Sequence, residues 1–127
     1  MSSETSAGRR EPAAYTAQAH EIAALLDALE VTLRESHWWG TAAPAPERLA
    51  SPLPFCVDTL SITEWLQWVF LPRMRALLRA RQALPMGCAI RPIAEEQLSN
   101  QPREAASVLA LLARIDVCLS KPPKRLH

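Results

Sequence analysis

The chain has 127 residues, of which 49% are apolar and 21% are charged, and its formal net charge is +1. This balance is typical of one globular domain and excludes a disordered chain, and the small net charge gives no bulk attraction to nucleic acid or anionic lipid. Three widely spaced cysteines without a C-x-x-C pair favour reduced thiols over a disulfide framework or a cysteine-bound metal. We therefore expect a cytoplasmic protein without a metal or cofactor.

The two ends of the chain differ from its middle. Residues 1–12 are polar and lack the apolar region of a signal peptide, and residues 121–127 contain two adjacent prolines that stop a helix. We expect flexible tails at both ends, because they offer little surface to bury. Residues 13–120 should form a single helical domain, and no apolar run is long enough for a membrane span.

The first predicted helix covers residues 13–36. Its apolar residues fall at helical spacing on one face: Ile22, Leu25, Leu26, Leu29 and Leu33. On the opposite face, Glu30 and Arg34 are placed for an i, i+4 ion pair. Gly40 is expected to stop the chain in a left-handed conformation after the helix.

Residues 41–60 form the longest predicted loop. Four prolines prevent a continuous helix there: Pro44, Pro46, Pro52 and Pro54. The loop also contains apolar residues such as Phe55. We therefore expect an ordered proline-rich segment that lies across the bundle.

A second helix is predicted from Ser61 to about Arg81. Ser61 and Glu64 match the capping-box pattern directly before an apolar run. Pro72 lies inside this helix, where proline removes one backbone hydrogen bond and clashes with the preceding turn. The sequence leaves two alternatives open: the helix kinks at Pro72, or it ends at Leu71 and restarts.

Two further helices complete the prediction. A turn at Leu84–Gly87 precedes a short helix at residues 93–98. The final helix should run from Pro102 to about Leu119, with an apolar stripe of Ala105, Val108, Leu112, Ile115 and Leu119. The predicted fold is therefore all-α: a compact helical bundle of three main helices plus one short helix.

One long motif resembles a known family. It combines Pro54–Leu60 (PFCVDTL) with Glu64–Met74 (EWLQWVFLPRM), and it is supported by His37-Trp38, Leu84-Pro85 and Ile90–Pro92. These segments resemble the YqcC-like family of small bacterial proteins. The similarity extends over about residues 18 to 119, whereas the N-terminal tail departs from the family pattern.

The resemblance implies a helical bundle with no established enzymatic activity of its own. Genes of the family often lie beside a tRNA pseudouridine synthase, which implies an accessory role in tRNA modification. It supplies no catalytic residues to transfer to this chain. The partners that it implies are the synthase, its tRNA, or both.

A candidate partner-binding surface lies on the outer side of the second helix. Trp68, Leu71, Arg75 and Arg79 follow one another at helical offsets, and an aromatic ring beside guanidinium groups is suited to stack on a base or to grip a protein. The alternative is that the chain itself covers Trp68. Residues 65–94 contain five arginines and no acidic residue, which makes this the one clear charge asymmetry in the sequence.

A candidate ligand pocket is expected between the second helix and the 41–60 loop. Arg73 falls within the apolar arc of a regular helix and would need a partner. Asp58 is the expected partner, and Trp65 would complete the pocket. The alternative role for Arg73 and Asp58 is an ion pair that fixes the loop.

The sequence contains no recognisable catalytic motif, and its histidines lack metal-ligand spacing. We therefore expect a non-enzymatic accessory protein that binds a macromolecular partner. The alternative is a small-molecule-binding helical bundle that uses the pocket. A homodimer that covers an exposed tryptophan patch is a further possibility.

Overall fold

The computed structural model describes residues 13–120, and the tails expected at residues 1–12 and 121–127 lie outside the described residues. Within this part the chain is helical and forms no strand, as the sequence predicts. The main elements are α2 (Ala13–Glu35), α4 (Ile62–Trp65), the π-helical turn η2 (Leu66–Phe70), α5 (Leu71–Arg79), α6 (Ile90–Gln97) and α7 (Pro102–Cys118). Two short helices precede α4: α3 (Pro46–Leu49) and η1 (Pro54–Cys56).

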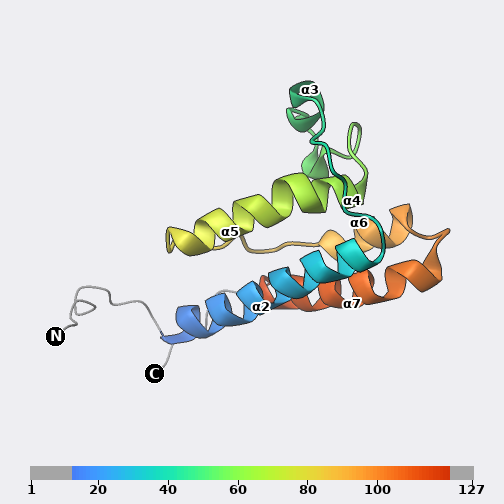
Figure 1. Cartoon of the computed structure of the whole chain (residues 1–127). Helices are drawn as coiled ribbons and strands as arrows, with labels where there is room; N and C mark the ends of the chain where they lie inside the picture. Colours follow the sequence, from blue (N-terminus) through green and yellow to red (C-terminus); the bar gives the residue numbers. More distant parts are fainter. Residues whose placement is uncertain (1–12, 121–127) are drawn as a thin grey trace.

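The core lies where α2 and α7 run side by side and the α4–α5 helix covers them (Figure 1). Both predicted apolar stripes are confirmed, because every residue of each stripe is buried. From α2 they are Ile22, Leu25, Leu26, Leu29 and Leu33, and from α7 and its C-terminal end Ala105, Val108, Leu112, Ile115 and Leu119.

Helix α2 ends at Glu35, and the left-handed residue that follows it is His37 rather than the expected Gly40. His37 has φ 63°, the Trp38 N–H donates to the Leu33 carbonyl at 2.9 Å, and the His37 N–H donates to Arg34. This pair of bonds is a Schellman stop. Gly40 has a different role, because its N–H and its carbonyl both bond to the amide of a buried glutamine, Gln67, at 2.7 and 2.8 Å.

The capping box at the start of α4 is confirmed. The Ser61 hydroxyl accepts a hydrogen bond from the Glu64 N–H at 3.2 Å, and the Glu64 carboxylate accepts one from the Ser61 N–H at 3.0 Å. The helix then continues without a break through Pro72. Its turn widens just before the proline, since the Leu71 N–H donates to the carbonyl of Leu66, five residues earlier.

This π-turn explains why the regular-helix prediction placed two residues on the wrong sides. One extra residue in a turn rotates everything after it by roughly 100°, the angle of one helical residue. Leu71, expected on the outer surface, is 1% exposed and lies in the core. Arg73, expected in the apolar arc, is exposed to solvent.

The 41–60 segment is ordered, but Figure 1 shows α3 set apart from α2 and α7, so the segment does not lie across the bundle. It is attached near the start of α4 instead. The Arg48 guanidinium bonds to the Glu64 carboxylate at 2.8 Å and to the Thr59 carbonyl at 2.9 Å. Cys56 anchors the segment because its side chain is buried.

Helix α6 begins at Ile90, earlier than the sequence predicts. The carboxylate of Asp116 on α7 accepts hydrogen bonds from the N–H groups of Ile90 and Arg91, each at 2.9 Å. These N–H groups belong to the first turn of a helix, where no intrahelical acceptor exists. A tertiary contact therefore sets the start of α6.

An ion-pair cluster joins α5 to α2. The Arg75 guanidinium bonds to Glu30 at 2.7 Å and to Asp27 at 3.0 Å, and the predicted Glu30–Arg34 pair is also present at 2.9 Å. The hydrogen bond from Arg75 holds the pKa of Glu30 below its ordinary value of 4.5. Glu30 therefore stabilises the fold in its charged form.

We expect Leu71→Ala to lower the free energy of unfolding by about 2–5 kcal/mol, because it empties a fully buried leucine site. Arg73→Ala should change it by less than about 0.5 kcal/mol, as is usual for an exposed side chain. Urea unfolding followed by tryptophan fluorescence measures both. An equal loss of unfolding free energy in the two variants would contradict the placement of Leu71 in the core and of Arg73 in solvent.

We expect Glu30→Gln to lower the free energy of unfolding at neutral pH by about 1 kcal/mol. A lowered folded-state pKa means that the contribution is complete above pH 4.5 and disappears as the pH falls through the lowered value. The gap between wild type and variant should therefore close in acid. Glu35→Gln, which removes an exposed carboxylate on the same helix, is the control, and a gap independent of pH would exclude this role.

Candidate functional site

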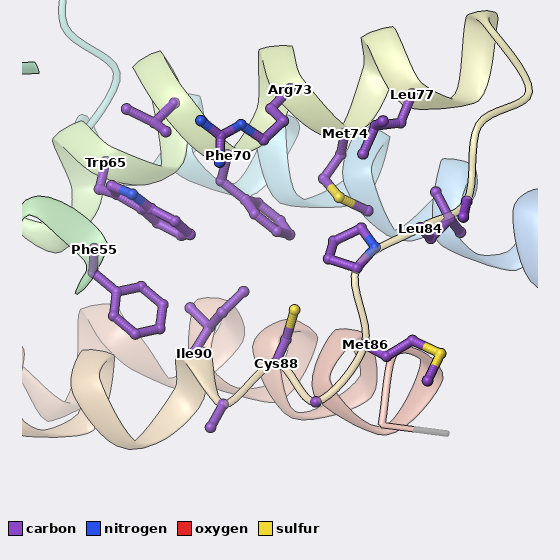
Figure 2. A pocket seen from close by; sticks show the side chains of 15 residues that line it. Phe55, Trp65, Phe70, Arg73, Met74, Leu77, Leu84, Met86, Cys88 and Ile90 are labelled. Atoms are coloured by element: carbon purple, nitrogen blue, oxygen red, sulfur yellow. The ribbon is translucent and has the colours of Figure 1, made fainter. Parts of the chain in front are cut away.

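A pocket of about 510 Å³ lies between the α4–α5 helix and the segment that leads into α6 (Figure 2). Its size is typical of a ligand or side-chain site. Its lining comes from Phe55, Trp65, Val69, Phe70, Arg73, Met74 and Leu77 on one side and from residues 83–90 on the other. Most of these side chains are apolar, and Arg73 is the one charged residue among them.

Three aromatic rings form one wall of the pocket. Phe55 meets Trp65 edge to face, with ring centroids 4.9 Å apart. Trp65 in turn stacks on Phe70 with centroids 5.3 Å apart. Trp65 ends α4 and Phe70 ends the π-turn, so the capped start of this helix and its widened turn together position the two rings.

Phe55 reaches this wall through an unusual backbone. Phe55 and Cys56 have φ of 59° and 49°, in the left-handed region that non-glycine residues rarely adopt. Such conformations cost free energy and persist only where the surroundings hold them. Burial of Cys56 and the contact of Phe55 with Trp65 supply that support.

The opposite wall is the non-helical segment 83–89. Leu84 holds it to the core with a buried side chain, and the N–H of Gly87, at φ 75°, donates to the Leu119 carbonyl at 2.8 Å. Between these two attachments, Met86 is 54% exposed. The segment therefore presents an apolar side chain to solvent at the edge of the pocket.

Arg73 gives the pocket its charge. It is exposed and makes no hydrogen bond or ion pair with any residue between 13 and 120. Figure 2 shows its guanidinium above Phe70 on the α5 side. Because residues 65–94 include no acidic side chain, no carboxylate of the lining neutralises it. The pocket thus combines an apolar interior with one available cation.

The thiol of Cys88 also lines the pocket. Burial raises its pKa, and the negative charge of Asp116 raises it further. The thiol is therefore protonated near neutral pH, and since the thiolate is the reactive form, Cys88 acts as a small apolar lining group.

The structure brings together two of the three residues of the sequence-predicted pocket. Trp65 and Arg73 do line one cavity. Asp58 does not belong to it, because it is exposed and its carboxylate accepts a hydrogen bond from the Ser51 hydroxyl. The expected Arg73–Asp58 pair is therefore wrong, and its physical reason is the π-turn, which moves Arg73 outward and removes its need for a buried partner.

The sequence-predicted surface of Trp68, Leu71, Arg75 and Arg79 is not assembled. Leu71 is in the core and Arg75 is engaged by two carboxylates of α2. Trp68 is half-buried, and Arg79 is exposed. The four residues do not share one outward face, because the π-turn separates Trp68 from the phase of the later three.

Sequence reasoning missed the wall formed by residues 83–89, which it treated as a turn. A signal was present: Leu84, Met86 and Cys88 alternate in a segment without charge, and an apolar loop is seldom free in solvent. The alternation did not show which helix this loop would face.

The described residues contain no group of three or more His, Cys, Asp or Glu side chains placed to hold a metal ion. Between residues 13 and 120, every helix is too short or too polar to cross a membrane.

Comparisons with known proteins all point to one family. Residues 21–118 match the model of the DUF446 family, described as "tRNA pseudouridine synthase C". The chain is 42% identical over 91 residues to the uncharacterised protein YqcC of Escherichia coli, covering 72% of this chain and 84% of that protein. An uncharacterised protein of Haemophilus influenzae is 48% identical over 75 residues, 59% of this chain and 71% of the relative.

A third relative is much longer. A Pectobacterium carotovorum protein named tRNA pseudouridine synthase C is 53% identical over 57 residues, which are 45% of this chain but 15% of that protein. The solution structure of Escherichia coli YqcC has the same fold, with a TM-score of 0.74 and 35% identity over 87% of this chain and 94% of that one. The length of the family match and the shared fold show that the chain belongs to the YqcC-like family.

Proposed function

We propose that the protein is a non-enzymatic accessory protein that binds a macromolecular partner through the pocket. The observation that carries the proposal is the apolar pocket with Arg73 available at its wall. The neighbouring arginines Arg75 and Arg91 are paired with carboxylates, whereas Arg73 lines the pocket and has no such partner among the described residues. Concave apolar sites with a few polar groups are the usual binding sites for small ligands, and pockets that receive an anchoring side chain carry much of the binding energy between proteins.

The proposed partner is a tRNA pseudouridine synthase, alone or with its tRNA. Support comes from the printed description of the family and from the Pectobacterium relative, in which a segment similar to this chain is a small part of a longer protein named tRNA pseudouridine synthase C. A domain joined to an enzyme experiences a high effective concentration of it. The joined arrangement in that relative therefore supports the proposal that this separate protein acts together with the same enzyme.

The binding surface in this proposal differs from the surface predicted from sequence. Leu71 and Arg75 are occupied by the fold itself. Trp65, Arg73 and Met86 are the residues that a partner can contact, because they line the pocket and none of them is fully buried.

We expect the protein to co-purify with a tRNA pseudouridine synthase from its native cell. Arg73→Glu should weaken that association, because it replaces the available cation with an anion. Arg79→Glu changes an exposed arginine on the same helix that does not line the pocket, and it should leave the association intact. Mass spectrometry of the bound proteins and sequencing of bound RNA provide the measurement.

Deletion of the gene should also reduce the pseudouridine content of cellular tRNA. Expression of the wild-type or the Arg79→Glu protein should restore it. Chemical mapping of pseudouridine measures it. Unchanged modification together with absence of the synthase from the purified material would exclude the accessory role.

A second candidate function is small-molecule binding. The volume of about 510 Å³ favours it, because pockets of roughly 300–1,000 Å³ hold drug-sized ligands. We expect a retained ligand to appear in native mass spectrometry of the protein purified from its own host and to be absent from Trp65→Ala. A bare polypeptide mass for the wild-type protein would count against this candidate.

A further inference from the structure

We infer that the pocket binds an extended segment of a partner protein, which places an apolar side chain in the pocket and a carboxylate beside Arg73. The inference rests on the proposed function, since it names the chemistry by which a protein partner is recognised. Three observations carry it: the apolar lining, the available charge and the backbone N–H groups of the 83–89 segment, of which only that of Gly87 is hydrogen-bonded within the described residues.

The lining suits one apolar side chain of a partner. Trp65 and Phe70 provide flat rings, and Met74 and Met86 provide flexible thioether chains. Methionine adapts its shape to different occupants, and aromatic residues in such pockets contribute much of the binding energy at protein interfaces. Met86 is 54% exposed, so an occupant would cover an apolar side chain that solvent now reaches.

The charge of the site selects a carboxylate. Arg73 is exposed and has no partner within residues 13–120, so an incoming carboxylate does not have to displace another one. Arg75 on the same helix already holds Asp27 and Glu30 and cannot serve in this way. Guanidinium groups bind carboxylates with two parallel hydrogen bonds, which fixes the orientation of the bound segment.

The backbone of the 83–89 wall favours a peptide over a small molecule. Apart from the Gly87 N–H, the N–H groups of this segment make no hydrogen bond to the described part of the chain. A non-helical segment with open backbone donors and acceptors can pair with an extended chain, as in β-strand addition. A small apolar ligand would fill the pocket but leave these groups unused.

A library of random peptides displayed on phage tests the inference. Peptides of about ten residues span the 83–89 segment at roughly 3.3 Å per residue. The full chain is used as bait in four forms: wild type, Arg73→Glu, Arg79→Glu and Met86→Ser. Wild type and Arg79→Glu should enrich sequences with an apolar residue near Asp or Glu, and Arg73→Glu should instead enrich sequences with an apolar residue near Lys or Arg.

Affinity and position are then measured with a peptide selected on the wild type. Its affinity should fall about tenfold for Arg73→Glu, in which attraction becomes repulsion. It should stay within about twofold for Arg79→Glu, because Arg79 does not line the pocket. Its binding should shift the NMR signal of the Trp65 indole N–H. Met86→Ser and Trp65→Ala should both weaken it, and circular dichroism confirms that each variant is folded.

Three results would overturn the inference: no enrichment by the wild type over Met86→Ser, the same acidic sequences selected by Arg73→Glu, or saturable binding of decanoate with no selected peptide. None of these three results determines whether the synthase co-purifies with the protein. If the synthase co-purifies while no peptide is enriched, the docking chemistry is wrong but the accessory role stands. If peptides are enriched and the synthase does not co-purify, the partner is a different protein.

Discussion

The wide turn at Leu66–Phe70 determines which side chains of the long helix face the core and which face the pocket. Proline at position 72 cannot donate a backbone hydrogen bond, and its ring crowds the preceding turn of a regular helix. A π-turn relieves that conflict, because the Leu71 N–H finds its acceptor five residues back. The added residue rotates α5 so that Leu71 enters the core and Arg73 leaves it.

Long-range polar contacts fix the walls of the pocket relative to this helix. The side-chain oxygen of Gln97 on α6 accepts a hydrogen bond of 2.8 Å from the Ile62 N–H at the start of α4. Asp116 of α7 accepts the first N–H groups of α6. Helix starts leave N–H groups without intrahelical partners, and here side chains from other helices satisfy them. Each contact therefore completes a helix, and the Asp116 contact also positions Ile90 in the lining of the pocket.

The site differs from the rest of the fold in how its polar groups are used. Several charged residues elsewhere are paired, as in the Arg75 cluster with Asp27 and Glu30 and the Arg48–Glu64 pair. Around the pocket, Arg73 and the backbone of residues 83–89 have few protein partners. Such groups can bind a partner without first breaking a bond inside the protein, which is the physical basis for placing recognition there.

Local sequence determined the main helices, and tertiary structure determined the start of α6 and the site. The stripes on α2 and α7, the Ser61 capping box and the all-α class followed from the spacing of residues near one another in the chain, because helical periodicity and capping are local. Trp65, which the sequence predicts to lie in a pocket, lines one in the structure. Residue spacing could predict neither the opposite wall of the pocket at residues 83–89 nor the exposure of Arg73. Both depend on a π-turn and on contacts between distant segments, and residue spacing in a regular helix does not encode either.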